Sequence, residues 1–226
     1  EKMTVVLAKA LLYTHFNKKA EELALEDYKP GDKLIPFKVV GEYKGPDLVG
    51  MEYEQLIPWV KPVTVDENGK WQEAAGQAFR VILGDYVTTE DGTGIVHIAP
   101  TFGADDAKVA KDAHIPSLFL INKKGETRPM VDLEGKYYLI DELDANFVND
   151  CVDAEAYGRH AGDYVKNAYA PEFNKDGKYD EKGAAKAEDL NIVICMEMKQ
   201  DGTVFKIEKH VHNYPHCWRT DKPILY

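Results

Sequence analysis

The chain has 226 residues, and its 39 acidic and 28 basic residues give a formal net charge of -11. This length allows one large domain or two small ones with a substantial core. The negative charge argues against a protein that binds nucleic acid mainly through its overall field, although a local basic face remains compatible with it. Cys151, Cys195 and Cys217 are odd in number and lack close pairing, which argues against a disulfide framework and fits a reducing compartment.

The sequence contains no pattern typical of a membrane span or a signal peptide. No apolar run approaches the roughly 20 residues needed to cross a bilayer, and the N-terminus lacks the basic-then-apolar pattern of a signal peptide. We therefore expect a cytoplasmic chain with no membrane partner. Residues 1–8 and 223–226 both lie within apolar runs, and the chain starts without Met, so we expect a fragment of a larger protein.

The first half of the chain is dominated by short extended segments. Residues 3–8 are rich in β-formers and precede an apolar stripe of helical spacing over 9–25. The turn Pro30-Gly31-Asp32 ends this part. Further strands are predicted at 37–40, 48–53, 79–83, 86–89 and 94–99, with a loop tip over 66–70.

The second half mixes helices with strands. A helix is predicted over 103–113, a second helical stretch over 143–167, and an exposed loop or weak helix over 173–187. Buried strands are predicted at 191–198 and 204–212, joined through a hairpin at Asp201-Gly202. The expected fold is mostly β, with a β-barrel-like core and helical insertions that give it α+β character.

The segment from Gly92 to Asp106 has the features of a binding site. Gly92 and Gly94 flank Thr93, so the backbone can turn sharply and approach a ligand closely. His97 interrupts a mostly apolar predicted strand, and a buried imidazole needs partners for its ring nitrogens. Pro100 ends the strand because proline cannot donate to a ladder. A glycine turn and a histidine are thus predicted beside one pocket.

Asp105 and Asp106 follow in the first turn of the predicted helix. The helix dipole and the free backbone N–H groups favour an ionised carboxylate there. An ionised carboxylate is suited to binding an ammonium group or positioning a water, and poorly suited to acting as a general acid. The pattern predicts recognition of an amine. Taken singly, a histidine in a strand is more often a satisfied core residue than a functional one, and acidic residues at a helix start are usually caps.

Two long motifs carry a resemblance to a known family. Gly-Thr-Gly-Ile-Val-His-Ile-Ala-Pro over 92–100, with Phe-Gly-Ala-Asp-Asp over 102–106, resembles the editing-domain signature of isoleucyl-tRNA synthetases. Tyr-Pro-His-Cys-Trp-Arg-Thr-Asp-Lys-Pro-Ile-Leu-Tyr over 214–226 resembles the segment where that family's inserted domain returns to the catalytic core. Valyl and leucyl relatives usually carry Ala-His-Asp after the proline, where this chain has Thr101-Phe102-Gly103. The resemblance implies a class I synthetase editing-domain fold.

The same resemblance implies how the chain is organised. It would be a single, partial editing domain over 1–226, with an acidic insertion at 121–190 and a return segment at 213–226. Its partners would be the acceptor end of tRNA(Ile), a mischarged valine and the remainder of the synthetase chain. No cofactor is expected in this domain, because ATP and Mg belong to the catalytic core of the complete enzyme.

The activity implied is proofreading in support of isoleucine–tRNA ligation. The substrate would be valine esterified to tRNA(Ile), with valyl-adenylate as a second candidate. By position, Asp106 matches the catalytic-site aspartate that holds the α-amino group of the mischarged residue, and His97 matches a wall residue that excludes the larger side chain. Gly92, Thr93 and Gly94 are assigned to the substrate-binding rim. Water would attack the ester carbonyl without a protein general base.

Two departures from the family pattern matter. The family's threonine-rich strand is absent, since Thr88-Thr89 lies just before the central motif, and we therefore expect the isolated chain to be a weak or inactive hydrolase. Some relatives bind zinc through two cysteines around Trp-Arg, whereas here Thr220 stands in the second position after Cys217. His210, His212, His216 and Cys217 fit no common zinc spacing, so no metal is expected, and a junction packed by Trp218 is the favoured interpretation of this segment.

Two other functions remain open. The chain could be a non-catalytic tRNA-docking module of a valyl- or leucyl-type class I synthetase, with Trp218 stacking on a base. The basic residues that favour this reading are Lys199, Lys206, Lys209, Arg219 and Lys222. A carboxylate-pair hydrolase using Asp105 and Asp106 is less favoured, because adjacent helical residues point about 100° apart.

Overall fold

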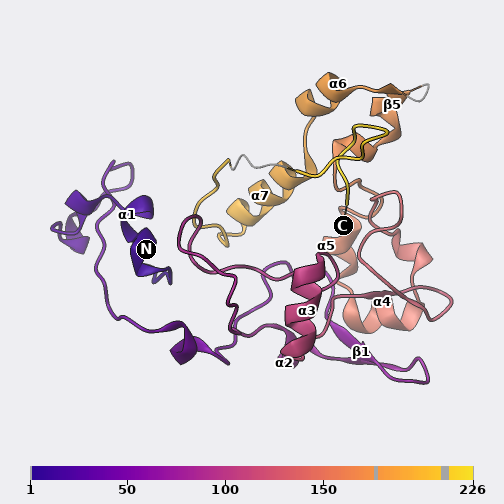
Figure 1. Cartoon of the computed structure of the whole chain (residues 1–226), viewed down its shortest axis with the longest axis horizontal. Helices are drawn as coiled ribbons and strands as arrows, with labels where there is room; N and C mark the ends of the chain where they lie inside the picture. Colours follow the sequence, from indigo (N-terminus) through magenta and orange to yellow (C-terminus); the bar gives the residue numbers. More distant parts are fainter. Residues whose placement is uncertain (1, 176–177, 210–213, 226) are drawn as a thin grey trace. The chain divides into compact units, whose positions relative to one another are not determined.

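A computed structural model describes residues 2–175, 178–209 and 214–225 (Figure 1). The chain divides into two compact units. Unit 1 comprises Glu1–Tyr53 and Arg80–Ile98, and unit 2 comprises Glu54–Phe79 and Ala99–Tyr226.

The described residues form short helices and shorter strands. The α-helices are α1 (Leu12–His15), α2 (Ala75–Ala78), α3 (Ala104–Asp112), α4 (Ala145–Cys151), α5 (Ala154–Gly158), α6 (Glu181–Lys186) and α7 (Leu190–Gln200). The 3-10 helices are η1 (Lys9–Leu11), η2 (Lys18–Ala20), η3 (Leu25–Asp27), η4 (Gly45–Leu48), η5 (Ile140–Glu142), η6 (Asn167–Tyr169) and η7 (Pro171–Phe173). The strands are β1 (Val63–Val65), β2 (Trp71–Glu73), β3 (Leu120–Ile121), β4 (Thr127–Arg128), β5 (Asn174–Lys175) and β6 (Lys178–Tyr179).

Unit 1 is built from helical turns and irregular extended backbone. The helical stripe predicted over 9–25 is broken after α1, because the Asn17 side chain accepts a hydrogen bond from the Lys19 N–H at 3.0 Å and starts a new turn. Phe16 and Phe37 pack with ring centroids 5.0 Å apart. Phe37, Leu11 and Ala20 are the buried apolar residues among those described in this unit.

The strands predicted in unit 1 are not formed in its described part. Residues 3–8, 37–40, 48–53, 80–83, 86–89 and 94–98 all lie outside regular strands. Glu52 and Arg80 form an isolated antiparallel bridge, and Val81 exchanges backbone hydrogen bonds with Gly50 and Met51. Apolar, β-forming residues predicted these strands, but a strand needs a partner in register along its length. Without one, Val39 and Val40 stay 52% and 83% exposed.

Unit 2 contains the three two-stranded antiparallel sheets, β1–β2, β3–β4 and β5–β6. In the first, Val63 pairs with Glu73 and Val65 with Trp71. The predicted loop tip over 66–70 is confirmed: the Asp66 N–H donates to the Lys70 carbonyl at 2.9 Å, and Gly69 has a φ of +77°. Glycine suits that left-handed position because it has no Cβ.

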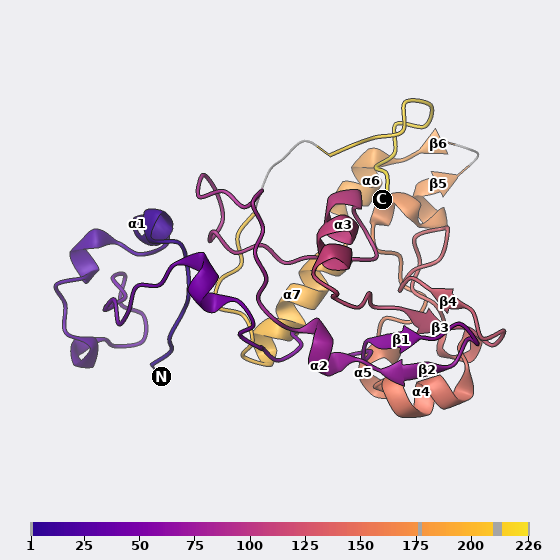
Figure 2. The same cartoon turned by 60° about the horizontal axis from the view of Figure 1, so that its bottom comes forward.

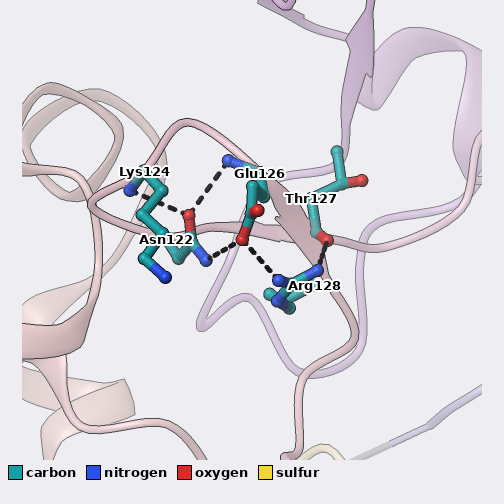
Figure 3. Close-up of polar contacts among 5 residues, drawn as sticks. All are labelled: Asn122, Lys124, Glu126, Thr127 and Arg128. Atoms are coloured by element: carbon teal, nitrogen blue, oxygen red, sulfur yellow. Dashed lines mark hydrogen bonds and ion pairs between the residues drawn. The ribbon is translucent and has the colours of Figure 1, made fainter.

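The β3–β4 connection shows how local side chains close a hairpin (Figure 3). Asn122 Oδ1 accepts hydrogen bonds from the backbone N–H groups of Lys124 and Glu126, at 2.9 and 3.0 Å. Its Nδ2 donates to the Glu126 carboxylate at 2.9 Å, and Arg128 pairs with that carboxylate from the other side. The Asn122 hydrogen bond and then the Arg128 charge lower the pKa of Glu126.

The core of unit 2 lies between the β1–β2 and β3–β4 hairpins and the helices α4 and α5 (Figure 2). Its buried members are Trp59, Val60, Val63, Leu120, Ile121, Leu143, Phe147, Cys151 and Tyr157. The segment 121–190 supplies Ile121, Leu143, Phe147, Cys151 and Tyr157, which is more than half of this cluster.

The helical stretch predicted over 143–167 consists of separate short helices. Asp144 and Asp153 each accept hydrogen bonds from two N–H groups at the start of α4 and α5. Such caps satisfy the free donors of a helix start, so each Asp begins a new helix and interrupts the longer one. The exposed loop or weak helix predicted at 173–187 contains the β5–β6 pair and α6.

The strand predicted at 191–198 is wrong, since this segment is helix α7. Asp189 caps its start by accepting from the Asn191 N–H at 2.9 Å, and Ile194 packs against the core of unit 2. The hairpin predicted at Asp201-Gly202 is instead the end of this helix: Gly202 has a φ of +73°, and the Thr203 N–H returns to the Met198 carbonyl at 3.0 Å. Residues 204–209 form no strand, and 210–212 lie outside the described residues.

The fold is therefore α+β with short antiparallel sheets. The expected barrel-like core is not formed by the strands described, because each pairs with one neighbour and the core is completed by helices. In the described parts of the chain, no helix is long and apolar enough to cross a membrane.

Candidate functional site

The Gly-Thr-Gly turn lies in unit 1, where it is bound to the N-terminal segment. The Ala8 N–H donates to the Thr93 carbonyl at 2.8 Å, and His15 Nε2 donates to the Gly92 carbonyl at 2.6 Å. Gly92 and Gly94 have φ values of +65° and +75°. The two glycines thus adopt the left-handed backbone that the motif predicted.

Gly94 also has a packing reason to lack a side chain. A Cβ at this position would overlap the Cβ of Ala8. By contrast, a Cβ at Gly92 would meet no atom within 4 Å. The close backbone approach predicted for a ligand is therefore made, at Gly94, by the chain's own N-terminal segment.

His97 lies on irregular backbone and is exposed. The prediction that it interrupts a buried strand is wrong, because Ile95 and Val96 beside it are 53% and 50% exposed and no ladder forms there. An exposed imidazole is satisfied by water. His97 is thus available to a ligand rather than engaged in the core of unit 1.

The helix predicted over 103–113 is confirmed as α3 in unit 2. Gly103 precedes it with a φ of +92°, and Asp105 and Asp106 occupy its first turn. Asp106 Oδ2 accepts a hydrogen bond from the Ala99 N–H at 2.9 Å, across a turn in which the Phe102 N–H donates to the Ala99 carbonyl. Asp106 is partly buried and Asp105 is exposed.

Asp106 consequently has a structural role that the sequence interpretation did not include. One carboxylate oxygen closes the Ala99–Phe102 turn onto the helix start. The backbone N–H donor fixes the orientation of the carboxylate beside the positive end of the α3 dipole. The second carboxylate oxygen of this partly buried side chain is the atom that could hold an ammonium group.

The candidate site residues fall into two groups. Gly92, Thr93, Gly94 and His97 belong to unit 1, and Asp106 belongs to unit 2. Their convergence on one substrate stays a prediction.

The C-terminal histidine and cysteine residues do not form a metal site in the part of the chain that the structure describes. His216 Nδ1 donates to the Tyr214 carbonyl at 2.7 Å. A hydrogen bond from Thr220, with backbone N–H groups of Arg219 and Thr220, lowers the pKa of the Cys217 thiol. Among the residues that the structure describes, no three His, Cys, Asp or Glu side chains gather in a way that could hold a metal ion. His210 and His212 lie outside those residues.

Sequence reasoning missed a buried polar cluster around His160 in unit 2. This side chain is 4% exposed, stacks on Trp59 at 4.8 Å, and contacts Asp163 at 3.3 Å through Nδ1. Its Nε2 contacts Glu197 of α7 at 2.9 Å. The partners Asp163 and Glu197 lie 3 and 37 positions away, and only the first spacing is a local signal.

Comparison with known proteins finds isoleucine–tRNA ligases along the whole chain. The identity is 72% over 226 residues with that of Bacteroides thetaiotaomicron, covering all of this chain and 19% of the ligase. It is 64% over 224 residues with that of Bacteroides fragilis and 52% over 225 residues with that of Porphyromonas gingivalis, each covering 99% of this chain and 18% of the ligase. In sequence, the chain belongs with a segment of the isoleucine–tRNA ligases.

The family resemblance inferred from the two motifs is thereby confirmed at the level of the synthetase. The chain spans about a fifth of the length of these curated ligases. A search of family models gives no match.

Proposed function

We propose that this segment is the proofreading part of an isoleucyl-tRNA synthetase, which hydrolyses valine wrongly esterified to tRNA(Ile). The observation that carries the proposal is Asp106, a partly buried carboxylate in the first turn of α3, within a motif that resembles the editing signature. The strong similarity to isoleucine–tRNA ligases supports the choice of amino acid and tRNA. The remainder of the synthetase would supply the threonine-rich strand and the ATP- and Mg-dependent ligation.

The need for proofreading follows from the small difference between the two amino acids. One methylene gives only about 1–3 kcal/mol of discrimination in an apolar pocket, and isoleucine against valine is the usual worked example of this limit. A second pocket that admits valine and excludes isoleucine supplies the missing selectivity. In this proposal, His97 on its exposed segment forms the wall of that pocket, and the Gly92–Gly94 turn forms its rim.

Asp106 would hold the substrate by its α-ammonium group. One carboxylate oxygen accepts from the Ala99 N–H, so the other oxygen is oriented before the substrate arrives, beside the positive end of the α3 dipole. The ester carbonyl would then be attacked by water, with no proton transfer assigned to a protein base. Binding of the amine fixes the ester relative to the site and contributes to catalysis through orientation.

The test is deacylation of valine-charged tRNA(Ile) by the complete synthetase carrying Asp106→Asn. Asparagine keeps an oxygen that can accept from the Ala99 N–H but removes the charge that binds the amine. A hydrogen bond to a charged group is worth about 1.5–3 kcal/mol, so we expect deacylation to fall by about 10- to 100-fold. Asp105→Asn, on the exposed neighbour, is the matched control and should leave the rate unchanged.

Asp106→Ala separates the two roles of this carboxylate. It removes both the charge and the acceptor for the Ala99 N–H, so it should also loosen the start of α3. Equal deacylation by Asp106→Asn and the unaltered enzyme would refute the amine-binding role. A loss of tRNA affinity with unchanged hydrolysis per complex would favour the docking module instead.

Isoleucine-charged tRNA(Ile) tests the size-excluding role of His97 in the same assay. His97→Ala should widen the pocket and allow isoleucine-charged tRNA(Ile) to be hydrolysed. Because the pocket would no longer exclude one extra methylene, we expect the rate of this hydrolysis to rise roughly tenfold or more. Unchanged protection of isoleucine-charged tRNA would remove His97 from the pocket wall.

A further inference from the structure

A compact turn near the C-terminus presents the most exposed tryptophan of the described residues. The Cys217 N–H donates to the Lys222 carbonyl at 2.8 Å, and the Asp221 N–H donates to the Cys217 carbonyl at 2.8 Å. His216 and Pro223 form an antiparallel bridge below it. The turn is therefore fixed by its own backbone, and Trp218 at its tip is 85% exposed.

The base of this turn is attached to unit 2 by a tyrosine. The Tyr169 hydroxyl donates to the Pro223 carbonyl at 3.1 Å, and the Ile224 N–H donates to the Pro215 carbonyl at 3.0 Å. Burial and then the neighbouring Tyr214 raise the pKa of Tyr169 to about 12. The turn is thus joined to unit 2 at its base, and these hydrogen bonds leave Trp218 unengaged by the backbone contacts that close it.

Aromatic rings and cations lie close together in this turn. Tyr214 and His216 lie edge to face at 6.2 Å, and Trp218 follows two residues later. The Lys166 ammonium lies 4.2 Å from the centre of the Tyr214 ring, and the Arg219 guanidinium lies 4.7 Å from the Trp218 ring. Each end of the aromatic series therefore carries a positive charge against a ring face.

We propose that the 214–223 turn binds unpaired nucleotides of the tRNA, with a base stacked on Trp218 and its phosphate beside Arg219. This partner deepens the proposed function and rests on it. Exposed rings with cations beside them are the usual recognition elements for single-stranded nucleic acid, because every base has a stacking face and every phosphate a negative charge. The cations supply the charge complementarity on a chain whose net charge of -11 would otherwise repel RNA.

A protein partner suits this surface less well. Protein interfaces bury an apolar residue within a surrounding apolar patch, whereas the residues flanking Trp218 at the tip of this turn are Arg219, Thr220, Asp221 and Lys222. A guanidinium already placed on one ring face leaves a polar rim and a planar stacking surface. That combination favours a base over an apolar side chain.

The test is titration of the 226-residue chain with a short single-stranded oligoribonucleotide ending in CCA, followed by tryptophan fluorescence. Stacking on Trp218 should quench its emission, while a blunt RNA duplex of equal charge should not. Loss of one base–aromatic stack costs about 1–3 kcal/mol, so Trp218→Ala should weaken binding by about tenfold, measured by anisotropy of labelled RNA. Arg219→Gln should weaken it and reduce its salt dependence.

Two controls match these changes elsewhere in unit 2. Leu133→Ala removes another fully exposed apolar side chain, and Lys124→Gln removes another exposed positive charge. Both should leave RNA affinity unchanged. Equal affinity of Trp218→Ala and the unaltered chain would overturn the proposal. Shielding of Trp218 from a soluble quencher in the complete synthetase without RNA would also overturn it, because a protein segment would then cover this side chain.

The outcome is separable from the proofreading test. Asp106→Asn should retain RNA binding by this turn, because Asp106 acts on the amino acid. If deacylation requires Asp106 while Trp218→Ala binds RNA normally, the docking turn is refuted and the proofreading proposal stands. If Trp218→Ala loses RNA binding while Asp106→Asn deacylates normally, the docking turn stands and the amine-binding role of Asp106 is refuted.

Discussion

The two units of the chain differ in how they are stabilised. Unit 2 has a continuous apolar core of nine buried residues, whereas the described part of unit 1 buries Leu11, Ala20 and Phe37. Unit 1 relies more on individual contacts, such as the hydrogen bonds from Ala8 and His15 to the glycine turn. Buried apolar area is the dominant stabilising term in folded proteins, so we expect unit 1 to open at much lower free energy than unit 2.

This difference bears on the candidate site. The Gly92–Gly94 turn and His97 belong to the unit with the smaller core, and Asp106 belongs to the unit with the larger one. Binding elements are often drawn from less stable regions, because a ligand can then select or order them. Asp106 thus lies in the unit that we expect to be the more stable one, and the Gly92–Gly94 turn and His97 lie in the unit that we expect to open at lower free energy.

The largest effect should come from truncating the core of unit 2. Phe147 is fully buried and packs edge to face on Trp71 at 5.7 Å, so Phe147→Ala should cost about 3–5 kcal/mol in the free energy of unfolding. Urea denaturation followed by tryptophan fluorescence measures it. Phe37→Ala in unit 1 is the matched change. Phe37→Ala should leave the urea transition of unit 2 unchanged and increase hydrogen exchange only within unit 1. An equal loss of unfolding free energy in both variants would contradict the comparison.

The second effect is a local one in unit 1. Gly92→Ala forces an alanine into a left-handed backbone, which costs about 1–2 kcal/mol. Gly94→Ala should cost more, because its Cβ would also overlap the Cβ of Ala8. Hydrogen exchange at the Ala8 N–H reports the loss of its bond to Thr93. Adding Ala8→Gly should rescue Gly94→Ala and leave Gly92→Ala unrescued, and the absence of that selectivity would show that the contact is not limiting.

These two elements also show what local sequence can predict. The loop tip at 66–70 and helix α3 are predicted correctly. Asp66 and Gly69 act on backbone within a few positions, and α3 begins directly after Gly103 with two acidic residues in its first turn. The left-handed glycines at 92 and 94 were predicted for the same reason. Each of these features depends on neighbours along the chain.

Features that depend on distant partners were not predictable in the same way. The apolar runs at 37–40 and 95–98 have strand composition, but their pairing depends on segments far away, and the described backbone does not pair them. The Ile- and Val-rich composition of α7 predicts a strand, whereas its Asp189 cap and the Glu197 contact with His160 favour a helix. The bond of Asp106 to Ala99 was missed because the side chain reaches back seven residues across a proline.

The third effect concerns the polar contact that attaches α7 to the core of unit 2. His160→Phe keeps an aromatic ring to stack on Trp59 but removes both contacts to carboxylates. Since Asp163 and Glu197 are 51% and 28% exposed, water can replace part of what they lose, and we expect a cost of about 1–2 kcal/mol.

Hydrogen exchange should increase along α7 in that variant while the β1–β2 hairpin stays protected. Glu197→Gln should reproduce this pattern, because it removes the α7 partner alone, and Asp163→Asn should not, because Asp163 lies outside α7. Unchanged exchange in α7 with His160→Phe would mean that Ile194 and its apolar neighbours hold the helix without the imidazole.

The smallest effect concerns the cause of a raised tyrosine pKa, which differs between the two units. Burial raises the pKa of Tyr157 in unit 2, where its hydroxyl donates to the Tyr138 carbonyl at 2.7 Å. A hydrogen bond to Glu21 is the main cause that raises the pKa of Tyr13 in unit 1, and that side chain is 51% exposed. Glu21→Gln should therefore lower the pKa of Tyr13 and leave that of Tyr157 unchanged in a tyrosinate absorbance titration.

The buried Tyr157 should link pH to stability more strongly than the half-exposed Tyr13. A phenol in the unfolded chain ionises near pH 10, while folded Tyr157 stays protonated above that pH, so the unfolded state loses its proton first. The stability contributed by neutral Tyr157 is complete below about pH 10 and falls as pH rises further. Tyr157→Phe should lower stability at neutral pH, through the lost hydrogen bond, yet flatten this alkaline decline. Tyr13→Phe should change both less, because the Tyr13 hydroxyl is half exposed and water can replace its hydrogen bond to Glu21. A larger flattening with Tyr13→Phe than with Tyr157→Phe would contradict the comparison.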